Sequence, residues 1–469
     1  MDGRGAKCMT HDEKVAWLCE QIASFYKTKT PFRVFHGTTN TTRILSFKRS
    51  SMVDISHLDK VLEVDTERSV ALVEPNVPMD KLARATLKKG LVPEVVMEFP
   101  GITVGGGVAG VGGESSSFKF GTFSETCESF EIITPDGKVR TVSAKKNPDL
   151  FHNFGGSFGT LGVLTKAAVR LVPAKRCVNL TYLPVKSFAE AVDTLQKHNT
   201  GEYDYADGIM FAKNRGVIMV GKMSDDAKGR KVRFTRARDP WFYLHVDEIT
   251  TETTEAVPLR DYLFRYDRGG FWVGRYAFEI FGVKFNQFYR WLLNPILHTR
   301  QLYEALQDSG ASQQFIVQDL GLPLQNATDF MNFIDRKFKI YPLWLCPMRP
   351  NLLSPFSVNN LKTQLAINIG VWGDRVENYD EFVKQNRLIE TELARMDGKK
   401  WLYSHSYYPR DEFWKIYNKK AYDTLRRKYH ADHLPNVYEK ISVKKVYPIE
   451  IKRGLLRTIT RRARLRVEN

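Results

Sequence analysis

The stretch FPGITVGGGVAGVGGESSSFKFG, residues 99–121, contains eight glycines in 23 residues. Its segment 105–110 matches the spacing G-x-G-x-x-G. As the fingerprint of a βαβ nucleotide site the match is weak, because Pro100 and Gly101 stand where a strand should end. Glycines and serines follow where a helix should begin, so we predict a loop with no helix of normal propensity. Glycines without Cβ atoms let successive backbone N–H groups converge on an anion.

A second glycine-rich run, GGSFGTLG at residues 155–162, lies beyond a predicted β-hairpin. The hairpin spans residues 129–142, with Pro-Asp-Gly supplying its turn. Two such loops in one domain favour a dinucleotide cofactor over a lone phosphate. The alternative for each loop is a glycine-rich turn that packs against a neighbouring sheet.

Composition and length describe an ordinary globular protein. The chain has 469 residues, of which 43% are hydrophobic and 26% charged, so two to four domains are expected. No apolar run approaches the ~20 residues that span a bilayer, and residues 1–10 have no apolar signal region. The five cysteines form no CxxC pair or Cys/His cluster, which argues against a metal site and favours a reducing compartment.

The net charge of +17 is concentrated in part at the C-terminus, where residues 452–466 carry seven Lys or Arg and no acid. This tail has two interpretations, a solvated segment or a contact with an anionic membrane surface. No nucleic-acid-binding motif accompanies it, so we expect no nucleic-acid partner.

Hydrophobic periodicity predicts an α+β chain in three parts. Helices are expected at 10–26, with a Thr10–Glu13 capping box, and at 78–89, 188–198, 379–395 and 411–429. Strands are expected at 32–35, 61–64, 70–73, 163–172, 341–348 and 365–371. Because glycine density falls beyond residue 173, we divide the chain into residues 1–174, residues 175–442 and a basic tail, residues 443–469.

Several longer phrases resemble a known family. The glycine loops, the Asp136-Gly137 turn and residues 147–163 resemble the FAD-binding domain of the p-cresol-methylhydroxylase (PCMH), or vanillyl-alcohol-oxidase, superfamily. Within it, LEVDTERSVALVEPNV, GTLGVLTKAAVRLVPAK, QQFIVQDLGLPL and YPLWLCPMRP resemble Δ24-sterol reductases, a resemblance that covers residues 11–441. It implies a two-subdomain FAD-binding PCMH-type fold, an α+β substrate (cap) domain and a C-terminal segment that returns to the flavin.

The resemblance also implies a cofactor site. FAD would lie along the first glycine segment and approach a turn at Gly37 and the second glycine run. Family members that bind flavin covalently use a histidine, but His36 is out of register, so we expect non-covalent FAD. NADPH would be the electron donor. The residues assigned to FAD are Thr103, Val104, Gly105, Gly106, Gly107, Val108, Ala109, Gly110, Val111, Gly112, Gly113, Glu114, Ser115, Gly37, Gly159 and Gly162.

The implied activity is reduction of the Δ24 side-chain double bond of a sterol or related lipid. The alternative is an FAD-linked oxidase of an alcohol or natural-product intermediate that uses oxygen. Catalysis is assigned to Tyr403 and His405, with Asp319, Tyr407 and Glu114 as further candidates for the acid; His298 and Cys346 are interpreted as structural. We expect the chain at the cytosolic face of the endoplasmic reticulum membrane or peripherally in the cytoplasm, without a spanning segment, and leave its oligomeric state open.

The segment 271–291 holds nine aromatic residues in 21. Core packing is its ordinary interpretation. Interleaved Arg275, Lys284 and Arg290 also suit a membrane interface, and the aromatic rings also suit the wall of a sterol pocket.

Overall fold

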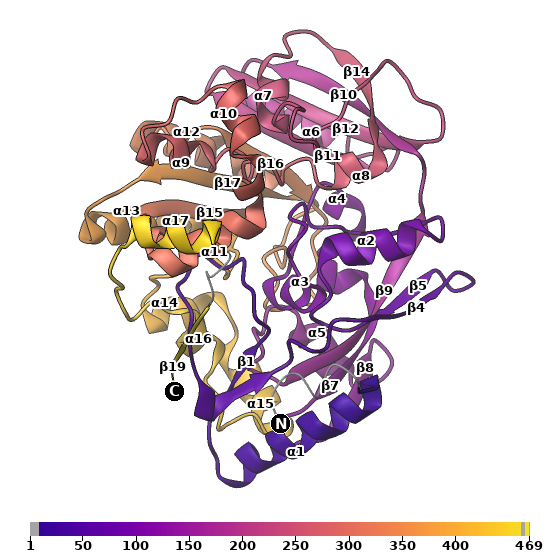
Figure 1. Ribbon diagram of the computed structural model, residues 1–469, viewed down its shortest axis with the longest axis vertical. Coiled ribbons are helices and arrows are strands. Elements are labelled where there is room, and N and C mark those ends of the chain that lie inside the picture. The colour runs from indigo at the N-terminus through magenta and orange to yellow at the C-terminus, as the bar shows by residue number, and fades with distance from the viewer. Residues whose placement is uncertain (1–8, 461–464, 469) are drawn as a thin grey trace.

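The computed structural model describes residues 9–460 and 465–468, and two large β-sheets organise them (Figure 1). The N-terminal sheet has the strand order β4-β5-β9-β7-β8, with β6 also paired to β9. The C-terminal sheet has the order β13-β14-β10-β12-β11-β16-β17-β15-β18. Helices and sheets together confirm the predicted α+β class. None of the helices formed by the described residues is both long and apolar enough to cross a bilayer.

The N-terminal part begins with a capped helix and builds the first sheet. Thr10 and Glu13 form the predicted capping box of α1, and β7 and β8 form the predicted hairpin. Its elements are α1 (His11–Lys27), β1 (Arg33–Phe35), β2 (Ser46–Lys48), β3 (Met52–Asp54), β4 (Val61–Asp65), β5 (Val70–Val73), α2 (Met79–Leu87), β6 (Leu91–Pro93), α3 (Val104–Gly110), α4 (Ser117–Phe120), β7 (Cys127–Ile133), β8 (Val139–Ser143), α5 (Pro148–Phe154) and β9 (Val163–Pro173).

The second sheet and its helices follow. The chain leaves the first sheet after β9 and enters the second at β10, a change that supports the proposed division at residue 174. The elements are β10 (Cys177–Val185), α6 (Phe188–Lys197), β11 (Tyr205–Ala212), β12 (Arg215–Ser224), β13 (Arg230–Lys231), α7 (Phe242–Asp247), β14 (Thr253–Pro258), α8 (Leu259–Leu263), α9 (Arg275–Ile280), α10 (Gln287–Leu292), α11 (Thr299–Ser309), β15 (Phe315–Pro323), α12 (Ala327–Lys337), β16 (Leu343–Met348), β17 (Ala366–Arg375), α13 (Tyr379–Arg395) and β18 (Lys399–Lys400).

The remaining elements return to the N-terminal half, except for the helix at residues 451–459, which packs on α11. Figure 1 shows α14, α15 and α16 on the side of the molecule that also carries α1, and His430, just after α15, contacts Tyr26 of α1 with ring centroids 5.8 Å apart. These elements are α14 (Arg410–Ile416), α15 (Lys419–Lys428), α16 (Val437–Ile441), α17 (Ile451–Ile459) and β19 (Arg466–Glu468).

Two predictions of secondary structure were wrong. The glycine segment is not all loop, because Thr103 caps α3 by accepting a hydrogen bond from Gly106 N–H. The glycines of α3 allow tight packing that offsets their poor propensity: a Cβ at Gly107 would lie 2.5 Å from Met97 Cε. The helix predicted at 411–429 is two helices, since Tyr417 is extended and Asn418 caps α15.

The basic tail is folded against the chain over its described residues. Helix α17 packs on α11, where Arg457 pairs with Asp308 at 3.0 Å. Strand β19 pairs in parallel with β2. The described tail residues are therefore packed on one side, while Lys452 and Arg453 are exposed as a solvated segment requires. Arg461, Arg462 and Arg464 lie outside the described residues.

Candidate active site

One cavity lies between the two halves of the molecule and encloses about 350 Å³, within the range of small-molecule sites. Glycines of both predicted loops line one side of it. Strands of the second sheet line the other side, together with Leu302 and Tyr303 of helix α11. The cavity therefore joins the predicted cofactor loops to the second sheet.

Eleven of the predicted site residues line this cavity. Gly110 is the most telling, because a Cβ added there would meet no protein atom within 4 Å, so its missing side chain leaves space in the cavity. The eleven are Thr103, Gly105, Gly106, Gly107, Ala109, Gly110, Gly112, Gly113, Gly159, Gly162 and Tyr403.

Other predicted residues support the wall without lining it. Val104 and Val108 are buried in the core, and the carbonyl of Val111 accepts a hydrogen bond from Trp401 Nε1 at 2.9 Å. Glu114 accepts hydrogen bonds from the hydroxyls of Ser115 and Ser116. Gly37 lines a separate pocket, although its neighbours His36 and Thr38 line the main cavity.

The sheet presents alternate residues of three neighbouring strands to the cavity, because side chains alternate between the faces of a strand. These residues are Val317 and Asp319 of β15, Trp344, Cys346 and Met348 of β16, and Asn368 and Trp372 of β17. The opposite face packs into a core with α6, α12 and α13. Cys346, which we interpreted as structural, thus belongs to the cavity wall.

Asp319 is the acidic group of this mostly apolar face. Tyr403 Oη donates a hydrogen bond to Asp319 Oδ2 at 2.5 Å, and Asn368 Nδ2 donates to Oδ1 at 3.0 Å. Burial raises the pKa of Asp319 to about 6, although both hydrogen bonds oppose the rise. A carboxyl group with this pKa can hold a proton near neutral pH.

His405 is placed differently from Tyr403. It does not line the cavity; its Nδ1 lies 3.0 Å from Thr42 Oγ1 and its ring meets Phe382 edge-on. Burial and the nearby cations Arg43 and Lys400 lower the pKa of His405 to about 3. It is therefore a neutral imidazole near pH 7 and lacks the imidazolium form that would act as an acid.

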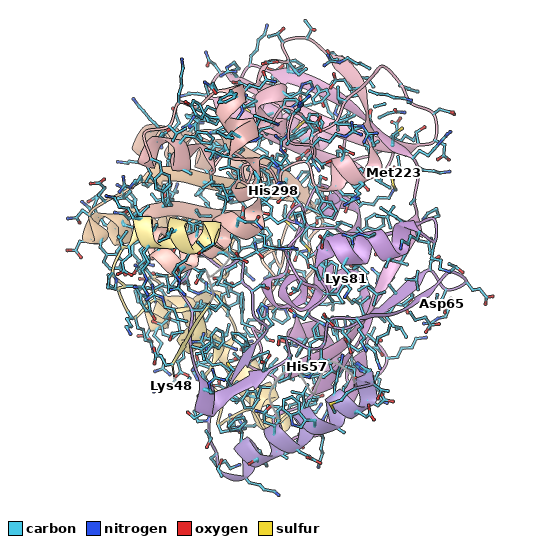
Figure 2. The ribbon with its side chains drawn as sticks, in the orientation of Figure 1. Lys48, His57, Asp65, Lys81, Met223 and His298 are labelled. Carbon is cyan, nitrogen blue, oxygen red and sulfur yellow. The ribbon has the colours of Figure 1, made fainter. Side chains whose placement is uncertain are left out.

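The other proposed acids and His298 lie away from the sheet face that lines the cavity. Glu114 and Tyr407 are absent from the residues that line the cavity. His298 lies in the half of the molecule that holds the second sheet (Figure 2), and its Nδ1 pairs with Asp267 at 2.6 Å. That contact agrees with a structural role for His298.

Three cations that sequence reasoning missed also line the cavity: Arg33, Arg43 and Lys440. Within the described chain none of them pairs with a carboxylate, and the Nε atoms of Arg33 and Arg43 are buried without a hydrogen-bond partner. Arg43 donates instead to the carbonyl oxygens of Leu402 and Ser404. Burial, with repulsion among the cations, lowers the pKa of Arg43 to about 9 and that of Lys440 to about 7.

Such a cluster is costly without a bound anion, because Arg43 is buried, Arg33 and Lys440 are half-buried, and desolvated charges are ordinarily paired. Three unpaired cations on one cavity wall therefore indicate a site for an anionic group. No motif in the sequence marks them, since residues 33, 43 and 440 come together only through folding.

Glu98 is a further buried group on the wall that sequence reasoning did not identify. Its side chain is 6% exposed, and Oε1 has no hydrogen-bond partner within the described chain. Burial, and then the charge of Glu114, raises the pKa of Glu98 well above its usual range. Burial therefore favours the neutral form of Glu98, a form that can donate or accept a hydrogen bond.

Comparisons with known proteins agree with this geometry. A family model described as an FAD binding domain matches residues 12–143. The chain is 31% identical over 457 residues to the human "Delta(24)-sterol reductase", covering 92% of this chain and 86% of that protein. It is 30% identical over 431 residues to the protein of the same name from Arabidopsis thaliana, covering 83% and 76%.

A likeness to a second protein family is limited to part of the chain. "Cytokinin dehydrogenase 9" from rice is 33% identical over 136 residues, which is 28% of this chain. The likeness to sterol reductases, which covers 92% of this chain, is thus the more specific one. With its PCMH-type FAD-binding domain and its cavity between two sheets, the chain belongs to the Δ24-sterol reductase family.

Proposed function

We propose that this protein reduces the Δ24 side-chain double bond of a sterol, with bound FAD as the redox cofactor and NADPH as the electron donor. The observation that carries the proposal is the pairing of Asp319 with Tyr403 on an apolar sheet face, across a cavity from the glycines of an FAD-binding domain. The cofactor-binding half is residues 1–174 and the substrate half is residues 175–442.

The residues on the cavity wall fit FAD. The open space at Gly110 admits a group close to the backbone, and the unpaired cations Arg33, Arg43 and Lys440 suit its pyrophosphate. Buried Nε atoms without partners are satisfied when an anion binds. We assign to FAD the predicted glycines that line the cavity and add these three cations.

The substrate would lie against the sheet face. Trp344, Trp372 and Phe271 form an aromatic wall in which Phe271 and Trp372 have ring centroids 4.3 Å apart. Trp344 is held by a hydrogen bond from Nε1 to Asp207 at 3.1 Å, and Arg265 neutralises Asp207 at 2.8 Å. A wall of this kind excludes water and suits a hydrocarbon side chain.

An isolated double bond accepts hydride poorly until its less substituted carbon is protonated. We assign that protonation to the Asp319 carboxyl, held in place by Tyr403 and Asn368. The carboxyl O–H bond and the π bond of the alkene break, a C–H bond forms, and Asp319 is left as a carboxylate with a tertiary cation on the neighbouring carbon. Reduced FAD, when bound, supplies the hydride that completes the reduction.

The test is incubation of the purified protein with NADPH and a panel of side-chain-unsaturated sterols. Products are read by mass spectrometry, and a gain of two mass units supports the proposal. Reduction of the flavin by an alcohol under anaerobic conditions, with none by NADPH, would instead indicate the oxidase. A protein with this substrate would work at the cytosolic face of the endoplasmic reticulum membrane or bound peripherally from the cytoplasm.

A further inference from the structure

Four large apolar side chains are exposed between residues 281 and 292. Phe281 is 39% exposed, Phe288 58%, Trp291 42% and Leu292 52%. We call these four side chains the aromatic surface. Soluble faces rarely gather large apolar groups in so short a segment, and such gatherings mark contacts with a partner or a membrane.

The aromatic surface has a fixed geometry. Phe288, Trp291 and Leu292 lie at positions i, i+3 and i+4 of α10, which places them on one side of that helix. The rings of Phe288 and Trp291 are 6.0 Å apart. Phe285, just before α10, packs on buried Trp241 with centroids 5.6 Å apart, so the segment is anchored from beneath.

The segment that carries the aromatic surface is basic. Residues 281–300 contain Lys284, Arg290 and Arg300 but no Asp or Glu, and Arg300 pairs with Asp80 at 3.7 Å. Lys284 is exposed, and Arg290 lies over the ring of Phe285 at 4.9 Å. Aromatic and aliphatic groups interleaved with cations match the interface of a bilayer with anionic headgroups.

The same segment joins two stretches that line the cavity. Gly270, Phe271 and Val273 line it on the N-terminal side, and Thr299, Leu302, Tyr303 and Leu306 on the C-terminal side. None of the four aromatic-surface residues lines the cavity. The segment that would contact a bilayer therefore lies directly between two stretches of chain that line the cavity.

We propose that the aromatic surface docks this protein on an anionic lipid bilayer and so brings the cavity to lipid held there. Its apolar side chains enter the interface while Lys284 and Arg290 meet the headgroups. That docking serves to deliver lipid to the cavity rests on the proposed function. The contact between the aromatic surface and a bilayer does not depend on that function. The basic tail, which α17 holds against α11, is not required.

The test uses the full chain with Phe288→Ser, Trp291→Ser and Leu292→Ser together. Co-sedimentation is measured with vesicles of phosphatidylcholine, with and without phosphatidylserine. We expect the wild-type chain to bind best when phosphatidylserine is present, and the triple variant to bind about tenfold more weakly or worse. The matched control, Leu352→Ser with Leu353→Ser, changes two equally exposed leucines elsewhere and should bind as wild type.

A second pair of assays separates docking from chemistry. Sterol offered from cyclodextrin should be reduced equally by wild type and triple variant, and sterol held in vesicles should be reduced only by wild type. If neither form reduces sterol, the proposed function fails while vesicle binding still tests the docking. Wild-type vesicle binding by the triple variant would overturn the inference. So would loss of binding on Lys452→Gln with Arg453→Gln alone, since that would assign docking to the tail.

Discussion

Replacing Lys440 with methionine should raise the free energy of unfolding of the ligand-free protein and lower its affinity for FAD. Lys440 lines the cavity, donates a hydrogen bond to the Phe158 carbonyl and pairs with no carboxylate in the described chain. Methionine keeps most of the aliphatic length and removes the charge. The two effects have opposite signs because the same cation is unpaired without ligand and paired with the pyrophosphate when FAD is bound.

The structure sets the size of the effect. Burial, then Arg33 and Arg43, lowers the pKa of Lys440 from 10.5 to about 7. At about 1.4 kcal/mol per pKa unit, less the screening due to its partial exposure, the unpaired charge costs the ligand-free fold about 2 to 4 kcal/mol. The methionine variant also loses the hydrogen bond to the Phe158 carbonyl, which reduces its gain in stability by about 1 kcal/mol.

The sign with pH follows from the lowered pKa. Between pH 7 and 10.5 the unfolded chain keeps a proton on Lys440 that the ligand-free fold has released. Unfolding then takes up a proton, so stability rises with pH across this window. Lys440→Met should remove that rise, and saturating FAD should suppress it in the wild type.

Denaturant unfolding of the ligand-free protein at pH 7 and pH 10, with FAD titration by fluorescence, measures both effects. We expect a gain of about 1 to 3 kcal/mol without ligand at pH 7, little or no gain at pH 10, and a Kd for FAD about tenfold weaker or more. Lys399→Met is the control, since burial also lowers the pKa of Lys399, to about 8, outside the cavity. Unchanged FAD affinity in Lys440→Met, or a less stable ligand-free fold, would refute the reasoning.

Further outcomes are expected. Gly110→Val should fold but purify without flavin absorbance, because a Cβ there meets nothing within 4 Å and the added side chain fills cavity space. Gly107→Val should fail to fold, and normal flavin content in Gly110→Val would contradict the assignment. Asp319→Asn should keep its flavin but reduce sterol about 100-fold more slowly or worse. It should also lose the increase in rate that the wild type shows as pH falls through about 6, and an unchanged pH profile would count against Asp319 as the acid. Acid precipitation should release the yellow colour into the supernatant, and colour kept by the pellet would indicate a covalent link, with His36 the first residue to examine.

Local patterns in the sequence were sufficient for many elements. The Thr10–Glu13 capping box, the Pro-Asp-Gly hairpin turn and the apolar period of α13 each depend on residues close in the chain, so they could be predicted directly. The glycine runs likewise marked a cofactor wall, since glycine alone leaves space for a ligand at the backbone.

Tertiary structure decided the remainder. Helix α3 forms among glycines because Met97 and Phe123 pack against it, and the tail is held by α11 and β2, contacts that no local window contains. Asp319 and Tyr403 are 84 residues apart, and only the return of the chain after β18 brings that hydroxyl to that carboxylate.

The sequence by itself determined the family, the α+β class and the glycine wall, because those signals are carried by residue type and short spacing. Only the tertiary structure decided which charged groups face the cavity. The pKa values of Asp319 and Lys440 are set by burial and by neighbours from distant segments, and burial is a property of the packed fold.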